Sequence, residues 1–470
     1  MSSISGIFSI AASALRASQA GLAVTGQNVA NVGTEGYSRQ HLRQEAIPGV
    51  RLPDGRLGGG VALHGADRSR DAFLDRAFRT ESSTAEGFRS HADLLRRLEG
   101  LTGEPGPDGL SSSLDRFLSA WSELASAPES PATRAMLRSE AETLARRIND
   151  VAGGVDRVVQ EGFDRLTDDV RRAQALATEL AAMNRSIVAA ESDGMPTPDL
   201  RDSRDRLLDE LAALLPVDVW PSADGSVRVT LGGLGLVEGP RAETLEVNLG
   251  GPGFQLRVGG SSITLSAAEG RVGGILEAIN RDVPSYRKEL DAFAQALVTS
   301  VNDLHRQGTN PLGQEGVDFF HVPLDGGGNP VPVSAAALRL SDAVLASPLA
   351  IAAGEGSDPG QAGNAFRSGA NDVALSLAGL RDSPAVGLTG TLSAHLQEAV
   401  STLAHRVRGS QDGAAIHGVL AQQAEIRRSE VSGVSLDEEM AKLIQFQASY
   451  AAAARVLSAA DEMLQTLLRV

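Results

Sequence analysis

The chain has 470 residues, enough for two or three domains, because single hydrophobic cores stop growing at roughly 250 to 300 residues. Its formal net charge of −16 makes it a poor candidate for binding nucleic acid or an anionic membrane, since both would repel it. It contains no cysteine, which excludes disulfide frameworks, thiolate zinc sites and cysteine nucleophiles. Aromatic residues make up only 4% of the chain, which favours helix-rich packing.

The N-terminal segment lacks the features of a secretory signal peptide. It reads MSSISGIFSIAASALR, with no basic residue before Arg16 and with serines that interrupt the apolar run. No later window offers about 20 consecutive apolar residues. We therefore expect no membrane insertion, and any export of the chain should proceed without a cleaved leader.

The first 29 residues carry a heptad pattern typical of a coiled-coil helix. Alternate steps of four and three residues give two rows of seam positions. The bulky row is Phe8, Leu15, Leu22 and Val29. The smaller row is Ile4, Ala11, Ser18 and Thr25.

The last 35 residues show the same spacing. One row contains Leu443, Tyr450, Leu457 and Leu464, and a more polar row contains Met440, Gln447, Ala454, Asp461 and Leu468. Ser435, followed three residues later by Glu438, is typical of the start of a helix. Each terminal helix has too little apolar bulk to fold alone, and its simplest partner is the other terminal helix.

Between the termini, helical periodicity predicts most of the chain. We expect helices over 69–99, 110–125, 131–151, 155–190, 200–215, 274–305 and 388–430, the last dented at GSQDG. Pro284 is a possible kink, and SGV at 432–434 is a hinge. Residues 216–266 alternate between glycine-rich turns and predict about five short antiparallel strands. Residues 308–360 look irregular, apart from strand-like pieces such as AALRL.

These elements predict a mainly α fold with a small antiparallel β portion and an elongated shape. We expect a terminal coiled-coil domain from 1–45 with 431–470. A helical-bundle inner domain would comprise 46–215 with 271–430, and a small β portion would comprise 216–270.

A search for reactive groups gives no catalytic, cofactor-binding or metal site. GGLGLVEG at 232–239 fails the dinucleotide-binding pattern, because the third glycine position holds Glu238, and we interpret it as a turn between strands. His395 and His405 are ten residues apart rather than at the i, i+4 spacing of a chelating pair. The carboxylates of LRDSRDRLLDE lie one helical turn from arginines, which predicts a solvent-exposed helix face. The chain is thus predicted not to be an enzyme.

Two motifs near the chain ends carry a family resemblance. NVANVGTEGYSRQ at 28–40 and SGVSLDEEMAKLIQFQASYAAAARVL at 432–457 resemble the flagellar hook-associated protein 1 family, the first hook-filament junction protein. Rod and hook proteins share the asparagine-rich helix exit but usually continue with GF and a lysine, whereas Gly36 to Gln40 look like the junction family. Interior stretches such as PESPATRAMLRSEAETLARRIN resemble that family's inner helical domain, so about two-thirds of the chain is covered.

The resemblance implies an axial structural protein that lies outside the cell in the bacterial flagellum. Such a protein would be exported through the flagellar type III apparatus, with a small chaperone on its C-terminal helix. It would polymerise with copies of itself between the hook protein and the second junction protein, hook-associated protein 3. Family members commonly carry a sizeable β domain after the DFF element, here 318–320. Only about 45 loop-like residues follow in this chain, so we expect the outer β domain to be reduced or absent.

The predicted assembly interface combines the bulky seam positions with two residues of the GYSRQ motif. It comprises Ile4, Phe8, Leu15, Leu22, Val29, Tyr37, Arg39, Met440, Leu443, Tyr450, Leu457, Leu464 and Leu468. Tyr37 either packs on its own helix or contacts the adjacent subunit, and Gly33 and Gly36 would let the backbone reverse. Two alternatives stay open. Another rod- or hook-type axial protein would show GF in place of GYSRQ, and an enzyme with helical oligomerisation ends would need a catalytic constellation.

Overall fold

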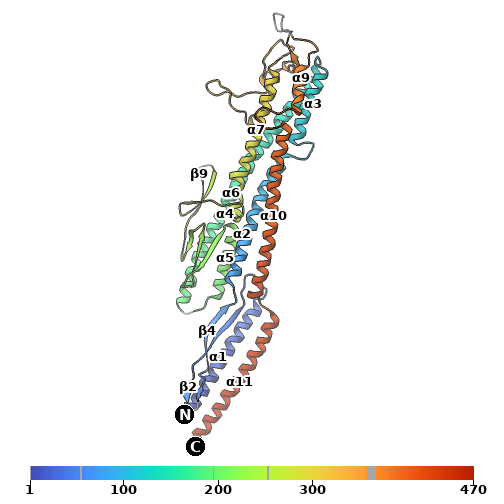
Figure 1. The fold of residues 1–470 in the computed structure, drawn as a ribbon. Helices are drawn as coiled ribbons and strands as arrows, with labels where there is room; N and C mark the ends of the chain where they lie inside the picture. Colours follow the sequence, from blue (N-terminus) through green and yellow to red (C-terminus); the bar gives the residue numbers. More distant parts are fainter. Residues whose placement is uncertain (1, 53–54, 194, 251–252, 357–365, 470) are drawn as a thin grey trace.

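The chain forms an elongated molecule with both ends at one pole (Figure 1). The structure is a computed structural model that describes residues 2–52, 55–193, 195–250, 253–356 and 366–469. The first helix, α1 (Ser2–Ala30), and the last, α11 (Leu436–Arg469), lie side by side at the lower end, below a body of long helices. A mainly α, elongated fold is thereby confirmed.

The body contains the helices that periodicity predicted, with two corrections. Its main helices are α2 (Ala72–Thr102), α3 (Leu110–Ser126), α4 (Pro131–Ser192), α5 (Pro198–Leu214), α6 (Gly270–Glu277), α7 (Val283–His305) and α10 (Leu392–Ser432). The helices expected over 131–151 and 155–190 are one continuous helix of 62 residues. The expected dent at GSQDG is also absent, since α10 continues through it.

Glycines misled both predictions because they serve close packing here rather than helix termination. A Cβ atom on Gly154 of α4 would lie 2.7 Å from Leu101 Cδ1, and one on Gly413 of α10 would lie 2.8 Å from Phe88 Cδ2. Both neighbours belong to α2, so the two glycines let three long helices approach closely. The irregularity expected at Pro284 lies just before it, in a π-helical turn over Ala278–Asp282.

Residues 217–263 form two small antiparallel sheets beside the long helices. The first contains β5 (Val217–Pro221), β6 (Val227–Leu231), β7 (Leu234–Glu238) and β8 (Arg241–Ala242) in sequence order. The second has the order β11-β10-β9, from β9 (Leu245–Gly250), β10 (Gly253–Val258) and β11 (Ser261–Ile263). Gly232 and Gly233, with φ of 56° and 82°, form the turn between β6 and β7, which confirms the turn interpretation of GGLGLVEG.

Four strands that the sequence did not predict follow α1. Strand β1 (Gln40–Ala46) pairs antiparallel with β4 (Val61–Arg68), and β2 (Val50–Leu52) pairs with β3 (Gly55–Leu57). The β1–β4 pair lies against α1 (Figure 1), where the Ser13 hydroxyl accepts a hydrogen bond from the Val61 amide at 3.2 Å. Most of β1 is exposed and shows no apolar alternation, so its sequence carries no strand signal.

The upper end of the molecule contains an aromatic cluster below a cap of loops. Phe319 of the DFF element packs against Trp121 with a centroid distance of 5.2 Å, and Phe320 packs against Phe319 with a centroid distance of 5.0 Å. Above them, the described residues of 308–391 form short elements: β12 (Gly308–Thr309), α8 (Asp342–Ala346), β13 (Gly354–Glu355) and α9 (Asp372–Ala378). The start of AALRL forms a 3-10 turn, Ala335–Ala337, rather than a strand.

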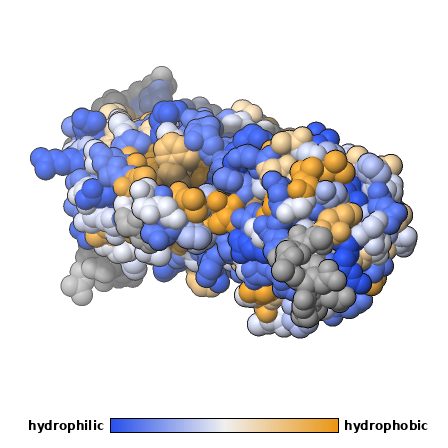
Figure 2. All heavy atoms as spheres, turned by 90° about the horizontal axis from the view of Figure 1, so that it is seen from above, coloured by the Kyte–Doolittle hydropathy of each residue, from blue (hydrophilic) through white to orange (hydrophobic). Residues whose placement is uncertain are grey.

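The cap has a mixed surface. Seen from above, Figure 2 shows hydrophobic residues in several groups set among hydrophilic ones. At the opposite end, Ser5–Ala30 is long and apolar enough to cross a membrane by length and composition alone, which the sequence analysis did not foresee. This is weak evidence for a membrane span, because helices of soluble proteins pass the same test. In this structure the helix packs on α11 and on the β1–β4 pair.

Candidate assembly site

The seam of α1 uses the smaller of the two predicted rows. Its buried positions include Ala11, Ser18, Gly21, Thr25 and Asn28. The bulky row flanks this seam and is only half-buried, namely Phe8, Leu15, Leu22 and Val29. The side chain of Ile4 lies outside the described part of the structure.

On α11 one predicted row is placed correctly in part and the other is shifted by one residue. Leu443 and Leu457 are half-buried, whereas Tyr450 and Leu464 are 38% and 37% exposed. The second row that faces α1 contains the buried Glu439, Ala453 and Ala460 and the half-buried Phe446. Of the residues predicted for this row, Met440, Gln447 and Asp461 are exposed and Ala454 is half-buried. The side chain of Leu468 is not described.

The register follows from a close approach at Gly21. A Cβ atom there would lie 2.5 Å from Phe446 Cε1, so the ring of Phe446 occupies the space that a larger residue on α1 would fill. Met440, which directly follows the buried Glu439, is 49% exposed. The two helices pack along each other, and the supercoiling of a true coiled coil stays a prediction.

Asn28 is the hub at the upper end of this pair. It is fully buried, and its amide nitrogen donates to the Gln40 carbonyl and to Glu439 Oε2, both at 2.9 Å. Its amide oxygen accepts from the Tyr37 hydroxyl at 2.8 Å and from the Gln40 backbone amide at 2.9 Å. One side chain thus joins α1, the GYSRQ segment and α11.

Glu439 is the buried acid of this hub. Arg39 donates through Nε to Glu439 at 3.0 Å and pairs through Nη2 with Glu438 at 2.7 Å, while Lys442 donates to Glu439 at 3.0 Å. Burial alone would raise the pKa of Glu439, but Asn28, Lys442 and Arg39 outweigh it and hold that pKa below its usual value. The acid is therefore ionised at neutral pH.

Tyr37 packs on its own chain rather than pointing away from it. Its ring is partly buried, and its hydroxyl bonds to Asn28. Burial and three nearby carboxylates, Asp199, Asp202 and Glu439, raise the pKa of Tyr37 to about 12. The phenol therefore stays protonated and acts as a donor. Of the two glycines expected to reverse the backbone, only Gly36 does so, with φ of 76°, since Gly33 keeps a negative φ.

The GYSRQ segment binds α5 through an aspartate. The backbone amide and the hydroxyl of Ser38 donate to the carboxylate of Asp202 at 3.0 and 2.7 Å. Gln40 donates to Asp199 at 3.1 Å, and the Arg39 amide donates to the Ser432 carbonyl at 2.8 Å. Consecutive residues of this motif thus contact α5 and the end of α10.

The prediction of a solvent-exposed face for the carboxylates of LRDSRDRLLDE holds for Glu210 but is wrong for Asp202 and Asp205, while Asp209 is half-buried. Asp202 and Asp205 are buried, and Arg68 at the end of β4 donates to both, at 2.6 and 2.8 Å. Burial opposes the ionisation of Asp205, but the guanidinium groups of Arg70, Arg68 and Arg79 lower its pKa. These arginines come from 68–79, so the spacing within α5 could not reveal them.

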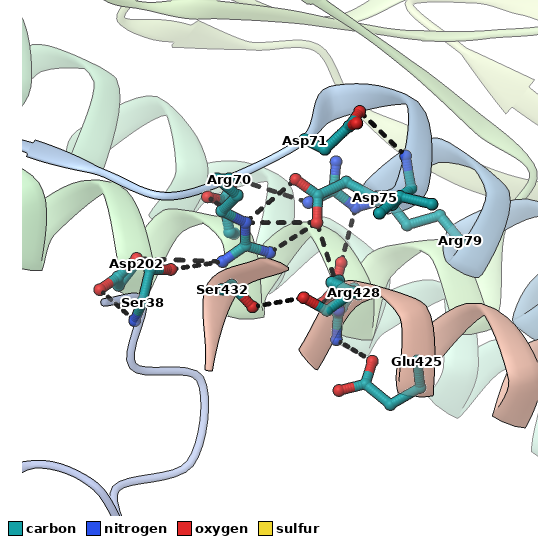
Figure 3. A network of polar contacts seen from close by, with 12 residues as sticks. Ser38, Arg70, Asp71, Asp75, Arg79, Asp202, Glu425, Arg428 and Ser432 are labelled. Carbon is teal, nitrogen blue, oxygen red and sulfur yellow. Dashed lines mark hydrogen bonds and ion pairs between the residues drawn. The ribbon is translucent and has the colours of Figure 1, made fainter. Parts of the chain in front are cut away.

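Figure 3 shows the network continuing from α2 to α10. Arg70 binds Asp75 through two nitrogens and also reaches the Ser38 hydroxyl at 3.2 Å. On α10, Arg428 stacks over the Phe78 ring, with its guanidinium carbon 4.1 Å from the centroid. Arg428 and Arg79 both donate to Asp209 at 2.6 Å. The terminal pair is thus connected to three helices of the body by charge-assisted hydrogen bonds.

Of the predicted interface residues, Tyr37 and Arg39 lie at this junction. Leu443 and Leu457 lie at the seam. Met440, Tyr450 and Leu464 are exposed. Sequence reasoning missed Asn28 and Glu439 as interaction centres. The predicted heptad rows gave no signal for them, because Asn28 precedes the seam position Val29 and Glu439 precedes the seam position Met440. No group of three or more potential metal ligands occurs within the described ranges.

Comparison with known proteins gives matches along most of the chain. A model described as the flagellar hook-associated protein FlgK helical domain matches residues 95–320, and one described as the flagellar basal body rod FlgEFG protein C-terminal matches 427–470. Flagellar hook-associated protein 1 of Bacillus subtilis is 28% identical over 499 residues, covering 97% of this chain and 96% of that relative. The protein of the same name from Salmonella typhimurium is 26% identical, covering 70% of this chain and 61% of its own length.

A solved structure shares the fold. The flagellar hook junction protein FlgK from Burkholderia pseudomallei superposes with a TM-score of 0.65 at 14% identity, covering 76% of this chain and 100% of that one. The matches to the rod-type C-terminal model and to the helical domain define the class as the axial proteins of the bacterial flagellum. Within that class, this chain is similar to flagellar hook-associated protein 1 along nearly its whole length.

Proposed function

We propose that this chain is a structural protein that forms the junction between hook and filament by polymerising through its terminal helices. The observation that carries the proposal is the number of large apolar side chains that α11 exposes. They are Leu436, Met440, Ile444, Tyr450, Val456, Met463 and Leu464. So many exposed apolar side chains on one helix favour an interaction surface, which neighbouring subunits would cover in an array.

Within this proposal the predicted interface residues divide into two groups. Met440, Tyr450 and Leu464 are available to neighbouring subunits, whereas Leu443 and Leu457 hold α11 on α1. Tyr37 and Arg39 bond within their own chain, which supports a role in fixing the angle between the terminal pair and the body. We keep the three predicted domains, and we assign β4, through Arg68, to the terminal one because it pairs with β1.

The partners proposed are copies of this chain, the hook protein, hook-associated protein 3 and an export chaperone on the C-terminal helix. The chain would be exported by the flagellar type III apparatus and would have no catalytic activity and no cofactor. Similarity to these relatives supports this set, since they bear the name hook-associated protein.

Deletion of the gene with electron microscopy of the cell surface tests the proposal. We expect hooks without filaments, with filament protein shed into the medium. Loss of the hooks themselves would favour a rod- or hook-type axial protein, and normal filaments would rule out the junction role.

A point variant tests the terminal surface separately. Met440→Glu places a charge in the proposed subunit contact and should reduce filament number, whereas Met195→Glu, at an exposed methionine of the body, should not. Equal filament numbers in both strains would contradict assembly through α11.

A further inference from the structure

A charged cavity opens between the start of α2, the middle of α5 and the β5–β6 hairpin. Three carboxylates, Asp75, Glu191 and Asp205, contribute to its lining. Twice as many guanidinium groups line it, from Arg68, Arg70, Arg76, Arg79, Arg201 and Arg204. Three further carboxylates just outside the lining, Asp202, Asp209 and Asp218, pair with Arg68, Arg79 and Arg76, so six carboxylates balance the six guanidinium groups.

Arg204 is the arginine that this set leaves without an ion pair. It is 4% exposed, and its Nη1 donates only to neutral oxygens, the Gly225 carbonyl at 2.8 Å and the Asn184 amide at 3.5 Å. Its Nε has no partner in the part of the chain that is described. Burial lowers the pKa of Arg204 to about 10, so the group is charged at neutral pH. A buried cation of this kind favours an anion in the adjoining cavity.

The other arginines are largely neutralised. Glu191 binds Arg201 at 2.8 Å, Asp75 binds Arg70 at 2.9 Å, and Asp205 accepts from Arg68. Arg79 pairs with Asp209 and Arg76 with Asp218, so Arg204 is the lining arginine for which the described residues supply no ion pair.

The rim has the composition of a protein-binding surface. Phe73 at the start of α2 is 77% exposed and Trp220 on β5 is 51% exposed. The Arg76 guanidinium lies 5.7 Å from the Trp220 ring centroid and pairs with Asp218 at 2.8 Å. Strand β5 is an edge strand, hydrogen-bonded only to β6 among the described strands. Exposed tryptophan and arginine together are typical of binding hot spots between proteins.

We propose that this cavity receives an acidic segment of a second copy of the chain, with Trp220 and Phe73 packing on its flanks. Charge supports a second copy as the occupant, because Arg204 donates only to neutral oxygens among the described residues and a chain of net charge −16 carries surplus carboxylates that could pair with it. A free small anion would not need the two exposed aromatic rings. This inference rests on the proposed function, since assembly places copies beside one another.

Site-specific photo-crosslinking in assembled flagella tests it. A photoreactive amino acid replaces Trp220 in the full-length chain, and a matched strain carries it at Leu249, an exposed residue of the second sheet. After irradiation we expect an adduct of twice the chain's mass from position 220, with a yield several-fold higher than from position 249. If substitution of Trp220 prevents assembly, Phe73 serves as the second crosslinking position.

A charge variant tests the electrostatic part. Arg76→Glu in the crosslinking strain should reduce the adduct several-fold, while Arg171→Glu, at an exposed arginine of α4, should leave it unchanged. An unchanged adduct in the Arg76→Glu strain would overturn the role of charge.

The outcomes separate this inference from the proposed function. Filaments that grow normally without any adduct would overturn the docking site and leave the junction role standing. An adduct with a different protein would overturn the second copy as the occupant.

Discussion

Asn28 uses every hydrogen-bonding group of its side chain, and its partners are Tyr37, Glu439 and both backbone groups of Gln40. Its two N–H groups serve Gln40 and Glu439, and its oxygen serves Tyr37 and Gln40. A buried amide with all four bonds made costs little, whereas its removal would leave several buried partners unsatisfied. Asparagine, unlike aspartate, also accepts from Tyr37 while donating to a carboxylate.

Asn28→Ala should therefore destabilise the terminal pair by about 3 kcal/mol, since the Glu439 carboxylate and two donors would lose a buried partner. Asn31→Ala is the matched control, because the amide nitrogen of Asn31 bonds only within its own turn, to the Gln27 carbonyl. Thermal unfolding followed by circular dichroism measures both variants. Equal losses would show that Asn28 is not the hub.

His305 provides a second test at this scale. It is fully buried, donates from Nδ1 to the Val317 carbonyl, and accepts at Nε2 from the Ala352 amide at 2.9 Å. Burial lowers its pKa from 6.5 to about 4, because a charged ring could neither be solvated nor accept that amide.

His305 therefore becomes protonated near pH 6.5 in the unfolded chain but only near pH 4 in the folded chain. The stabilisation is complete above pH 6.5 and falls as the pH drops, by roughly 3 kcal/mol in total. Urea unfolding measured between pH 7 and pH 4 checks this slope. In His305→Gln the slope over that window should largely disappear, and a persistent slope would assign it to other groups.

At the scale of elements, glycines decide how closely the helices approach. Gly21 and Gly26 lie on the same helix, but a Cβ atom would meet Phe446 only at Gly21, since Gly26 has open space around it. The packing of α1 on α11 thus depends on one position that has no side chain.

Gly26→Ala should raise stability by up to about 1 kcal/mol through helix propensity. Gly21→Ala gains the same propensity but must displace the Phe446 ring, and we expect a net loss of about 1 to 2 kcal/mol. Melting temperatures of the two variants measure the difference. Stabilisation by Gly21→Ala would contradict the close approach.

The same elements show what the sequence could and could not predict. Long periodic segments such as α2 and α7 were predicted because apolar spacing is local information. The predicted seam of α11 is shifted by one residue because the large side chain of Met440 suggested a buried position. In the structure the row is fixed by Phe446, whose ring fits the space that Gly21 leaves on α1. The sequence of α11 contains no information about that space on another helix. Asp202 and Asp205 were misplaced on the surface because their partners lie more than 100 residues earlier in the chain.

At the scale of the whole molecule, the terminal pair of α1 and α11 is attached to the body by polar interactions and few apolar contacts. The Ser38–Asp202 bonds, the Arg39–Ser432 backbone bond and the Arg68 pairs connect the two parts. Only Gly433 to Ser435 separate α10 from α11. The angle between the parts is therefore set by hydrogen bonds, which are directional but individually modest.

Asp202→Asn removes the charge that holds Ser38 and Arg68 and should loosen this angle without unfolding the body. We expect several-fold faster proteolysis at residues 433–435 and a changed small-angle scattering profile. Asp168→Asn, at an exposed aspartate of α4, is the control and should behave as the unmodified chain. Identical cleavage rates in all three proteins would contradict this role of the junction.

Acid should open the same junction. The pKa of Asp205 and that of Glu439 lie below their usual values of 3.8 and 4.5, so their stabilisation is complete above those values and is lost as the pH falls below them. Proteolysis of the terminal helices with an acid protease should accelerate below about pH 4, before the body unfolds. Simultaneous loss of body and termini, followed by circular dichroism, would argue against a separate opening step.

The Asn28–Glu439 bond joins two residues that are 411 positions apart. A chain synthesised from its N-terminus therefore holds residues 2–30 without their helical partner until nearly all of it has been made. Parts of the body, such as α4 with α5 and α2 with α6, have contacts that are shorter in sequence and can form earlier. Helix α10 also joins late, because it packs on α2 across 319 residues, as in the His91–Ser410 contact. The terminal pair is therefore the last part of the chain to form during folding and the first part that can separate during unfolding.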